Sequence, residues 1–157
     1  MQRRSLLHAA AALLGTVSLA SPLSGLTQTR PLVEVWKTPT CGCCHDWVTH
    51  MEANGFQVKT YDISDAAKAA QRRQLGLADK FGSCHTALVD GYVLEGHVPA
   101  REVRRLLKER PKALGLAVPG MPIGSPGMDG PAYAGRKDPY GVMLVQRGGG
   151  SSVYQSY

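Results

Sequence analysis

Three cysteines fall within four residues, and their spacing limits the chemistry that this chain could perform. They are Cys41, Cys43 and Cys44, placed where a short apolar run ends and a helical pattern begins. The fourth and last cysteine, Cys84, is followed directly by His85. Free backbone N–H groups and a partial positive charge at a helix N-terminus favour thiolate over thiol. Because thiolate is both the nucleophile of disulfide exchange and a ligand for soft metals, both chemistries are open to these residues.

The flanking sequence predicts the elements that must position these thiols. Residues 32–37 are rich in β-forming side chains and predict a strand, and Thr40 is a candidate N-cap for the helix that follows. The apolar face of that helix consists of Cys44, Trp47, Val48 and Met51, at spacings of three and four. The pattern further predicts helices over 43–54, 65–75 and 100–110, and strands over 56–61, 86–89, 92–95, 140–145 and 153–157.

The order of these elements predicts an α/β fold of the thioredoxin-like kind. A β-α-β unit followed by a hairpin and a covering helix gives a mixed four-stranded sheet flanked by helices. A Gly/Pro/Met-rich loop and extra C-terminal strands follow this core. In such a fold the loop before the first helix lies beside the loop before the third strand. We therefore expect residues 41–44 to face residues 83–86.

The N-terminal residues have the pattern of an export signal. Arg3 and Arg4 precede a mostly Ala/Leu stretch over 6–19, and small residues lead up to Ala20. A membrane anchor or a disordered tail is the alternative, and the arginine pair leaves the Sec and twin-arginine routes both open. We expect a periplasmic protein whose mature chain has no membrane span. The expected organisation is a cleaved signal over 1–20, a linker over 21–31, a thioredoxin-like core over 32–112, and a loop and strands over 113–157 that complete the same domain.

The charge pattern argues against nucleic-acid binding. The chain carries 18 basic and 12 acidic residues, a net charge of +6 that falls by two when Arg3 and Arg4 are removed. Basic residues gather between 101 and 112 without interleaved aromatic residues, which a platform for single-stranded nucleic acid would need. A solvated helix face explains this cluster better.

Disulfide exchange is one reading of the cysteines. Cys41 and Cys44 have the C-x-x-C spacing of a thiol–disulfide oxidoreductase. Cys43 lies between them and could scramble such a disulfide. The Cys84-His85 pair stands where thioredoxin-like enzymes usually carry a cis-proline. A periplasmic thiol–disulfide oxidoreductase using Cys41 and Cys44 therefore remains the alternative function.

Metal binding is the favoured interpretation of the cysteines, and copper is favoured over zinc. Four thiolates, or three with His85, could hold zinc, but structural zinc sites usually carry two C-x-x-C pairs. The adjacent Cys43 and Cys44 suit more than one ion sharing bridging sulfurs, and soft sulfur ligands select Cu(I). A zinc-stabilised binding module is the third class of function.

Two methionines and several histidines complete the candidate ligands. Met121 and Met128 lie in the Gly/Pro loop, where their thioethers could bind a soft metal or pack over the site. His85 is the best imidazole ligand. His50 could be a ligand or a capping surface residue, and His97 could hydrogen-bond the loop or approach the metal, but non-ligand roles are favoured for both and for His45.

Longer motifs extend beyond the cysteines. They cover residues 40–44, 47, 50–51, 55–56, 83–87, 91–92, 95–99, 115–122 and 124–128. In these motifs the chain resembles the CopG-like copper-resistance proteins, many of which carry only a domain-of-unknown-function label, over about residues 32–145. The resemblance implies a thioredoxin-like fold, periplasmic residence and copper binding through the cysteine cluster. It further implies a helper role in copper detoxification, in which Cu(I) and Cu(II) are interconverted. It also implies other periplasmic copper-resistance proteins as partners, and leaves catalytic turnover open.

Overall fold

The computed structural model describes residues 29–157. The predicted export signal over 1–20 lies outside the described residues, as does most of the predicted linker over 21–31. Within the described part, no helix combines the length and the apolar character needed to cross a membrane.

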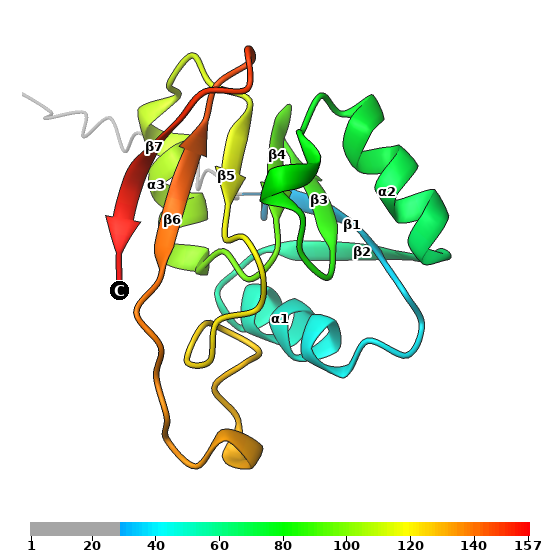
Figure 1. Cartoon of the computed structure of the whole chain (residues 1–157), viewed down its shortest axis with the longest axis vertical. Helices are drawn as coiled ribbons and strands as arrows, with labels where there is room; N and C mark the ends of the chain where they lie inside the picture. The colour runs from blue at the N-terminus through cyan, green and yellow to red at the C-terminus, as the bar shows by residue number, and fades with distance from the viewer. Residues whose placement is uncertain (1–28) are drawn as a thin grey trace, which may run out of the picture.

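A single mixed sheet of seven strands forms the centre of the molecule (Figure 1). The strand order is β2-β1-β3-β4-β5-β6-β7, with parallel pairing between β1 and β2 and between β4 and β5, and antiparallel pairing elsewhere. The strands are β1 (Leu32–Lys37), β2 (Gln57–Asp62), β3 (Thr86–Val89), β4 (Tyr92–Glu95), β5 (Gly115–Ala117), β6 (Gly141–Val145) and β7 (Ser151–Ser156). The helices are α1 (Gly42–Ala53), α2 (Asp65–Gln74) and α3 (Ala100–Glu109), with short 3-10 turns η1 (Asp79–Phe81) and η2 (Pro131–Tyr133).

Two apolar clusters cover the two faces of this sheet. The larger cluster joins Trp47 and Met51 of α1 and Leu106 of α3 to inward-facing strand residues such as Val35. The smaller one joins Leu77 and its neighbours after α2 to the opposite sheet face. The predicted apolar face of α1 is confirmed, because its buried residues are Cys44, Trp47, Val48 and Met51. Successive side chains of each strand point to opposite faces of the sheet, so neighbouring strand residues pack in different clusters.

The mixed α/β fold predicted from the sequence is confirmed, but the sheet is larger than expected. Strands β1 to β4 and the three helices follow the predicted order, and β5, β6 and β7 then extend the same sheet from β4. Strand β5 was not predicted, since three residues within a Gly/Pro-rich stretch carry no periodicity. A side chain at Gly115 would collide with the backbone of Val93, so β5 pairs with β4 only because this position is glycine. The thioredoxin-like classification stays a prediction.

The ends of two helices differ from expectation in ways that affect the site. Cys41, and not Thr40, is the N-cap of α1, and within the described residues it makes no side-chain capping hydrogen bond. The prediction of Thr40 was wrong by one residue, because α1 begins at Gly42, directly after Cys41. At the start of α3, the backbone N–H of Ala100 donates to Nε2 of His50 at 3.1 Å. His50 thus links α1 to α3 as a capping residue.

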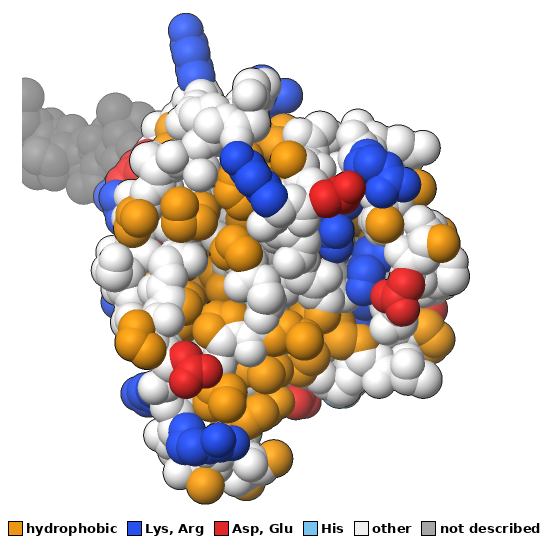
Figure 2. Space-filling view, viewed as in Figure 1, with side chains coloured by type: hydrophobic (Ala, Val, Ile, Leu, Met, Phe, Trp, Pro, Cys, Tyr) orange, Lys and Arg blue, Asp and Glu red, His pale blue; other side chains and the backbone are white. Residues whose placement is uncertain are grey.

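Figure 1 draws the long segment between β5 and β6 beside α1, and the close approach of Gly127 to Cys43 and Trp47 places part of it against the first turns of that helix. The Cβ position of Gly127 would meet the carbonyl oxygen of Cys43 at 2.6 Å and the backbone nitrogen of Trp47 at 2.8 Å. Gly127 has a φ of +86°, a conformation that glycine adopts without strain. Figure 2 shows hydrophobic side chains gathered across the lower half of this face, where Figure 1 draws α1 and this segment. We call residues 119–128 of this segment the methionine loop.

Candidate metal centre

The cysteine segment and the segment before β3 meet at one end of the sheet. Strands β1 and β3 are hydrogen-bonded neighbours, so the loop leaving β1 lies beside the loop entering β3. The sulfur atoms of Cys41, Cys43, Cys44 and Cys84 all lie within 4.8 Å of one another. The structure therefore brings together the two segments that the sequence predicted to face each other.

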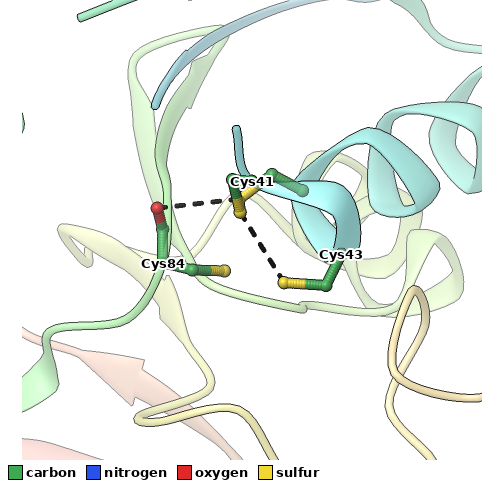
Figure 3. A group of neighbouring side chains, drawn as sticks. Cys41, Cys43 and Cys84 are labelled. Carbon is green, nitrogen blue, oxygen red and sulfur yellow. Dashed lines mark hydrogen bonds between the residues drawn. A yellow bond between two sulfur atoms is a disulfide. The ribbon is translucent and has the colours of Figure 1, made fainter. Parts of the chain in front are cut away.

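Cys41 and Cys44 form a disulfide, whereas Cys43 and Cys84 are free thiols. The sulfur of Cys43 lies 3.6 Å from that of Cys41, and the sulfur of Cys44 lies 3.7 Å from the carbonyl oxygen of Cys84. Figure 3 shows the sulfurs of Cys43 and Cys84 pointing toward each other across the space between the helix start and the β3 loop. In this form two of the four sulfurs are available as thiols, and reduction would release the other two.

A second group of ligand atoms shares Cys84 with the first. The sulfur of Cys84 lies 3.3 Å from Nδ1 of His85 and 2.8 Å from Nε2 of His97, and the ligand atoms of all three residues lie within 4.8 Å of one another. Nδ1 of His97 donates to the carbonyl oxygen of Pro126 at 2.8 Å, because a carbonyl can only accept. Neutral His97 therefore presents the lone pair of Nε2 to Cys84.

For His97 the sequence leaves a hydrogen bond to the loop and an approach to the metal both open, with the first favoured. The structure shows the hydrogen bond to Pro126 and also places His97 in this cluster. The signal that could have found it is the β3–β4 hairpin. Thr86 pairs with Glu95, so the residues just after β4 return beside the residues just before β3. His97 therefore comes next to Cys84 through hairpin register rather than through sequence proximity.

His85 is fully buried, as expected for a ligand rather than a surface histidine. Its ring packs on Trp47 with a centroid distance of 4.3 Å. Within residues 29–157, its Nε2 atom has no hydrogen-bond partner. Burial, and then the neighbouring His97 and Lys68, hold the pKa of His85 well below its ordinary value. A neutral imidazole whose Nδ1 atom faces the sulfur of Cys84 is suited to metal ligation.

The free thiol of Cys84 is held in its protonated form in the metal-free protein. Burial, reinforced by the adjacent Cys43, raises the pKa of Cys84 to about 12. Ser83 and Lys68 act in the opposite direction without overcoming the burial. Since metals bind thiolate, occupation of this position requires loss of the proton.

Charged residues that the sequence analysis did not single out hold the segment carrying Cys84. Nζ of Lys68 on α2 donates to the carbonyl oxygen of Cys84 at 2.8 Å. Arg72, one turn further along α2, donates to the carbonyl oxygen of Ser83 at 3.2 Å and pairs with Glu95 at 2.9 Å. The sequence of α2 gave only an Ala/Arg-rich pattern, in which no residue pointed to the site.

The methionine loop contacts the site through its backbone carbonyl groups, whereas its methionine sulfurs make no hydrogen bond to the cysteines within the described residues. The hydroxyl of Ser83 donates to the carbonyl oxygen of Gly120, and Pro126 accepts from His97. Met121 is 52% exposed, while the half-buried Met128 accepts a hydrogen bond at its sulfur from Tyr133 at 3.2 Å. Within residues 29–157 neither methionine sulfur hydrogen-bonds to a cysteine, so their role as ligands stays a prediction.

The fold and the site together define a class: a mixed α/β protein with a largely buried cysteine–histidine cluster of the kind that holds a metal ion. Residues 81–128 match the family described as "Protein of unknown function, DUF411". A search of curated proteins gave no significant match.

Two solved structures resemble most of the chain. One, titled "Copper resistance protein copG- Form 2", is 44% identical with a TM-score of 0.73, over 82% of this chain and 98% of that one. The other, titled "Copper resistance protein copG- Form 1", is also 44% identical with a TM-score of 0.73, over 80% of this chain and 96% of that one. The chain therefore belongs to the CopG-like family of copper-resistance proteins.

Proposed function

We propose that this protein is an exported copper-binding protein of copper homeostasis that holds Cu(I), more than one ion per chain, in its cysteine cluster. The ligands are Cys41, Cys43, Cys44 and Cys84, with His85 beside them. The titles of the two similar structures, both named for copper resistance, support copper as the metal. Soft thiolate ligands favour Cu(I), with zinc as the second choice.

The observation that carries this proposal is the position of Cys84. Its sulfur belongs to a group of four sulfurs on one side and to a group with two imidazoles on the other. A bridging thiolate at such a position can join two metal ions. The four sulfurs also exceed what a single low-coordinate Cu(I) requires.

The mixed ligand set supports a role in interconverting Cu(I) and Cu(II). Thiolates suit the reduced ion, and neutral imidazoles also suit the oxidised one. The thioethers of Met121 and Met128 are the supporting soft ligands that the methionine loop would add. They need no deprotonation to bind, unlike Cys84.

The location and organisation proposed for the protein follow from the sequence. After removal of residues 1–20 and a linker over 21–31, the mature protein would carry a core over 32–112 completed by residues 113–157. It would work in the periplasm, alongside other copper-resistance proteins and without nucleic acid. Fractionation of expressing cells, with N-terminal sequencing of the mature chain, tests the location and the cleavage near Ala20.

One observation favours a second function, that of a thiol–disulfide oxidoreductase. The Cys41–Cys44 disulfide at the start of α1 has the position that such an enzyme requires. Against it, Cys43 lies 3.6 Å from the sulfur of Cys41, where it can attack the disulfide. Reduction of a protein disulfide by the metal-free protein, and its loss in Cys44→Ser, would favour this alternative.

Titration of the fully reduced protein with Cu(I) against a competing chelator tests the copper proposal. We expect saturation above one equivalent per chain. The disulfide form is the matched control, and it should take up less copper because Cys41 and Cys44 are then unavailable. Saturation at a single equivalent, or preference for zinc in the same competition, would contradict the cluster.

A further inference from the structure

Three charged side chains outside the proposed ligand set are buried beneath the Cys84 segment. Lys68 and Arg72 come from successive turns of α2 and are each 8% exposed, and Glu95, the last residue of β4, is fully buried. Burying charge is costly unless each group is paired and hydrogen-bonded. Their partners therefore indicate what this arrangement holds in place.

Three of those partners belong to the backbone of two consecutive residues, Ser83 and Cys84. The others are side chains: Arg72 and Glu95 pair with each other, Thr86 donates to Glu95, and the exposed Asp65 and Asp79 pair with Lys68 and Arg72. Lys68 binds the carbonyl oxygen of Cys84, and Arg72 binds that of Ser83. Glu95 accepts from the backbone N–H of Ser83 at 2.6 Å and from the hydroxyl of Thr86 at 2.6 Å. Three of the four polar groups in the main chain of Ser83 and Cys84 are thus tied to charged side chains, and charge-assisted hydrogen bonds are the stronger kind.

The same segment has no room to move toward its neighbours. A Cβ atom at Gly82 would meet the Nη1 atom of Arg72 at 2.6 Å. A Cβ atom at Gly96 would collide with the side chain of Ser83 and meet the carbonyl oxygen of Val118 at 2.6 Å. The two glycines let the side chain of Arg72 and the backbone of Val118 lie close to this segment.

The residue held in this way, Cys84, belongs to both ligand groups, the four cysteines and the group with His85 and His97. The carbonyl oxygen of Cys84, held by Lys68 at 2.8 Å, is also the atom that the sulfur of Cys44 approaches at 3.7 Å. A shift of this segment would therefore separate Cys84 from α1 while leaving the spacing within residues 41–44 unchanged.

We propose that Lys68, Arg72 and Glu95 are positioning residues that hold Cys84 against the cysteines of α1, so that the two ligand groups act as one copper site. This inference rests on the copper-binding function proposed above. The three residues touch no metal themselves and act through the main chain of Ser83 and Cys84.

The test compares variants of Lys68, Arg72 and Glu95, which we call the clamp, with a variant of Arg73, a neighbouring residue on α2. Lys68→Met removes one backbone contact, and Arg72→Met/Glu95→Gln removes the ion pair without leaving a buried charge unpaired. Arg73→Met is the matched control, since Arg73 is 58% exposed and its ion pair is with Asp79 at the surface. We expect both clamp variants to lose ~10–100-fold in Cu(I) affinity, the usual cost of losing an outer-shell partner, and Arg73→Met to bind as the unsubstituted protein. Lys68→Arg, which keeps a charged donor, should regain most of the affinity.

Hydrogen exchange of the metal-free proteins provides a readout that does not depend on copper. We expect the amides of residues 82–85 to exchange at least ~10-fold faster in the clamp variants, with β1 and β6 unchanged, as for local rather than global opening. Clamp variants with unaltered exchange or with the affinity of Arg73→Met would overturn the inference. Exchange that rises equally throughout the sheet would also overturn it, by showing a general role in stability. If the unsubstituted protein bound no copper, the proposed function would fail, and the exchange data alone would still decide whether the clamp exists.

Discussion

The two halves of the site are built in opposite ways. The α1 half places three cysteines in one short segment at a helix start, and it carries the disulfide. In the β3–β4 half, Cys84 and His85 come just before β3 and His97 comes just after β4, so all three lie at the open end of the hairpin. Charged residues of α2 and β4 hold the main chain there. The disulfide lies wholly within the first half, whereas none of the three residues of the second half takes part in it.

This difference suggests different tasks for the two halves in the proposed copper site. Opening the disulfide would free two more sulfurs on α1. The hairpin half would then be the fixed part of the site, since charged side chains hold its main chain. Cys84 is the residue that the two ligand groups share, so its substitution should distinguish one joint site from two separate sites.

The largest effect is expected from Cys84→Ser. This variant should lose Cu(I) affinity as severely as Cys41→Ser, by at least ~10–100-fold, because a ligand is lost from both groups and not merely an outer-shell contact. Chelator competition on the reduced proteins measures it. His45→Gln is the control, since His45 is next to the cysteines in sequence but exposed. If Cys84→Ser kept full stoichiometry and affinity, the two halves would be independent.

A smaller effect is expected from Met121→Ala/Met128→Ala, which tests whether the methionine loop adds ligands to the site. Met121 is exposed and Met128 is half-buried, so the metal-free variant should melt close to the unsubstituted protein. The copper-bound form should lose part of its stabilisation, because ligands that bind the native state raise its stability. Melting temperatures with and without copper provide the measurement.

Met51→Ala is the matched control for the methionine pair. Met51 is fully buried in the core, so its truncation should cost ~2–5 kcal/mol with or without copper. An equal loss in both forms for the loop variant would identify Met121 and Met128 as packing residues.

The smallest effect is expected from His50→Gln, which concerns the scaffold beneath the α1 half. Burial, followed by the opposing effect of Asp129 and the assisting effect of Arg104, lowers the pKa of His50 from 6.5. The unfolded chain then binds more protons than the native one as pH falls below about 6.5, so native stability decreases with acidification there. Gln can still accept from Ala100, and the variant should show a shallower decrease. Urea unfolding of the metal-free proteins between pH 7.5 and pH 5 measures it, and identical pH profiles would contradict this role of His50.

Local sequence information was enough for the α1 half and for most of the fold. The apolar face of α1, the hairpin at Asp90-Gly91 and the meeting of the two cysteine segments all follow from periodicity, turn chemistry and strand order. Each of these depends on neighbouring residues or on a connection that the chain can make in few ways.

The parts that sequence reasoning missed depend on contacts made by long side chains or by backbone alone. Nothing in the Ala/Arg-rich sequence of α2 singles out Lys68 or Arg72, and only the packing of α2 beside β3 directs them to the Cys84 segment. His97 required the register of the hairpin, and β5 required the fit of Gly115 against Val93. None of these relations leaves a period or a short motif in the sequence.

The tautomer of His97 has a consequence for how the site fills. Its Nδ1 proton is committed to Pro126, so in the metal-free neutral state the contact with Cys84 uses the thiol proton of that cysteine, donated to Nε2. A proton therefore already lies between the sulfur and the nitrogen that a metal ion would bind. In the proposed site, loading at Cys84 would exchange this one proton for metal, so filling the site would release a proton from Cys84 to the solvent, and affinity would fall as the medium becomes more acidic.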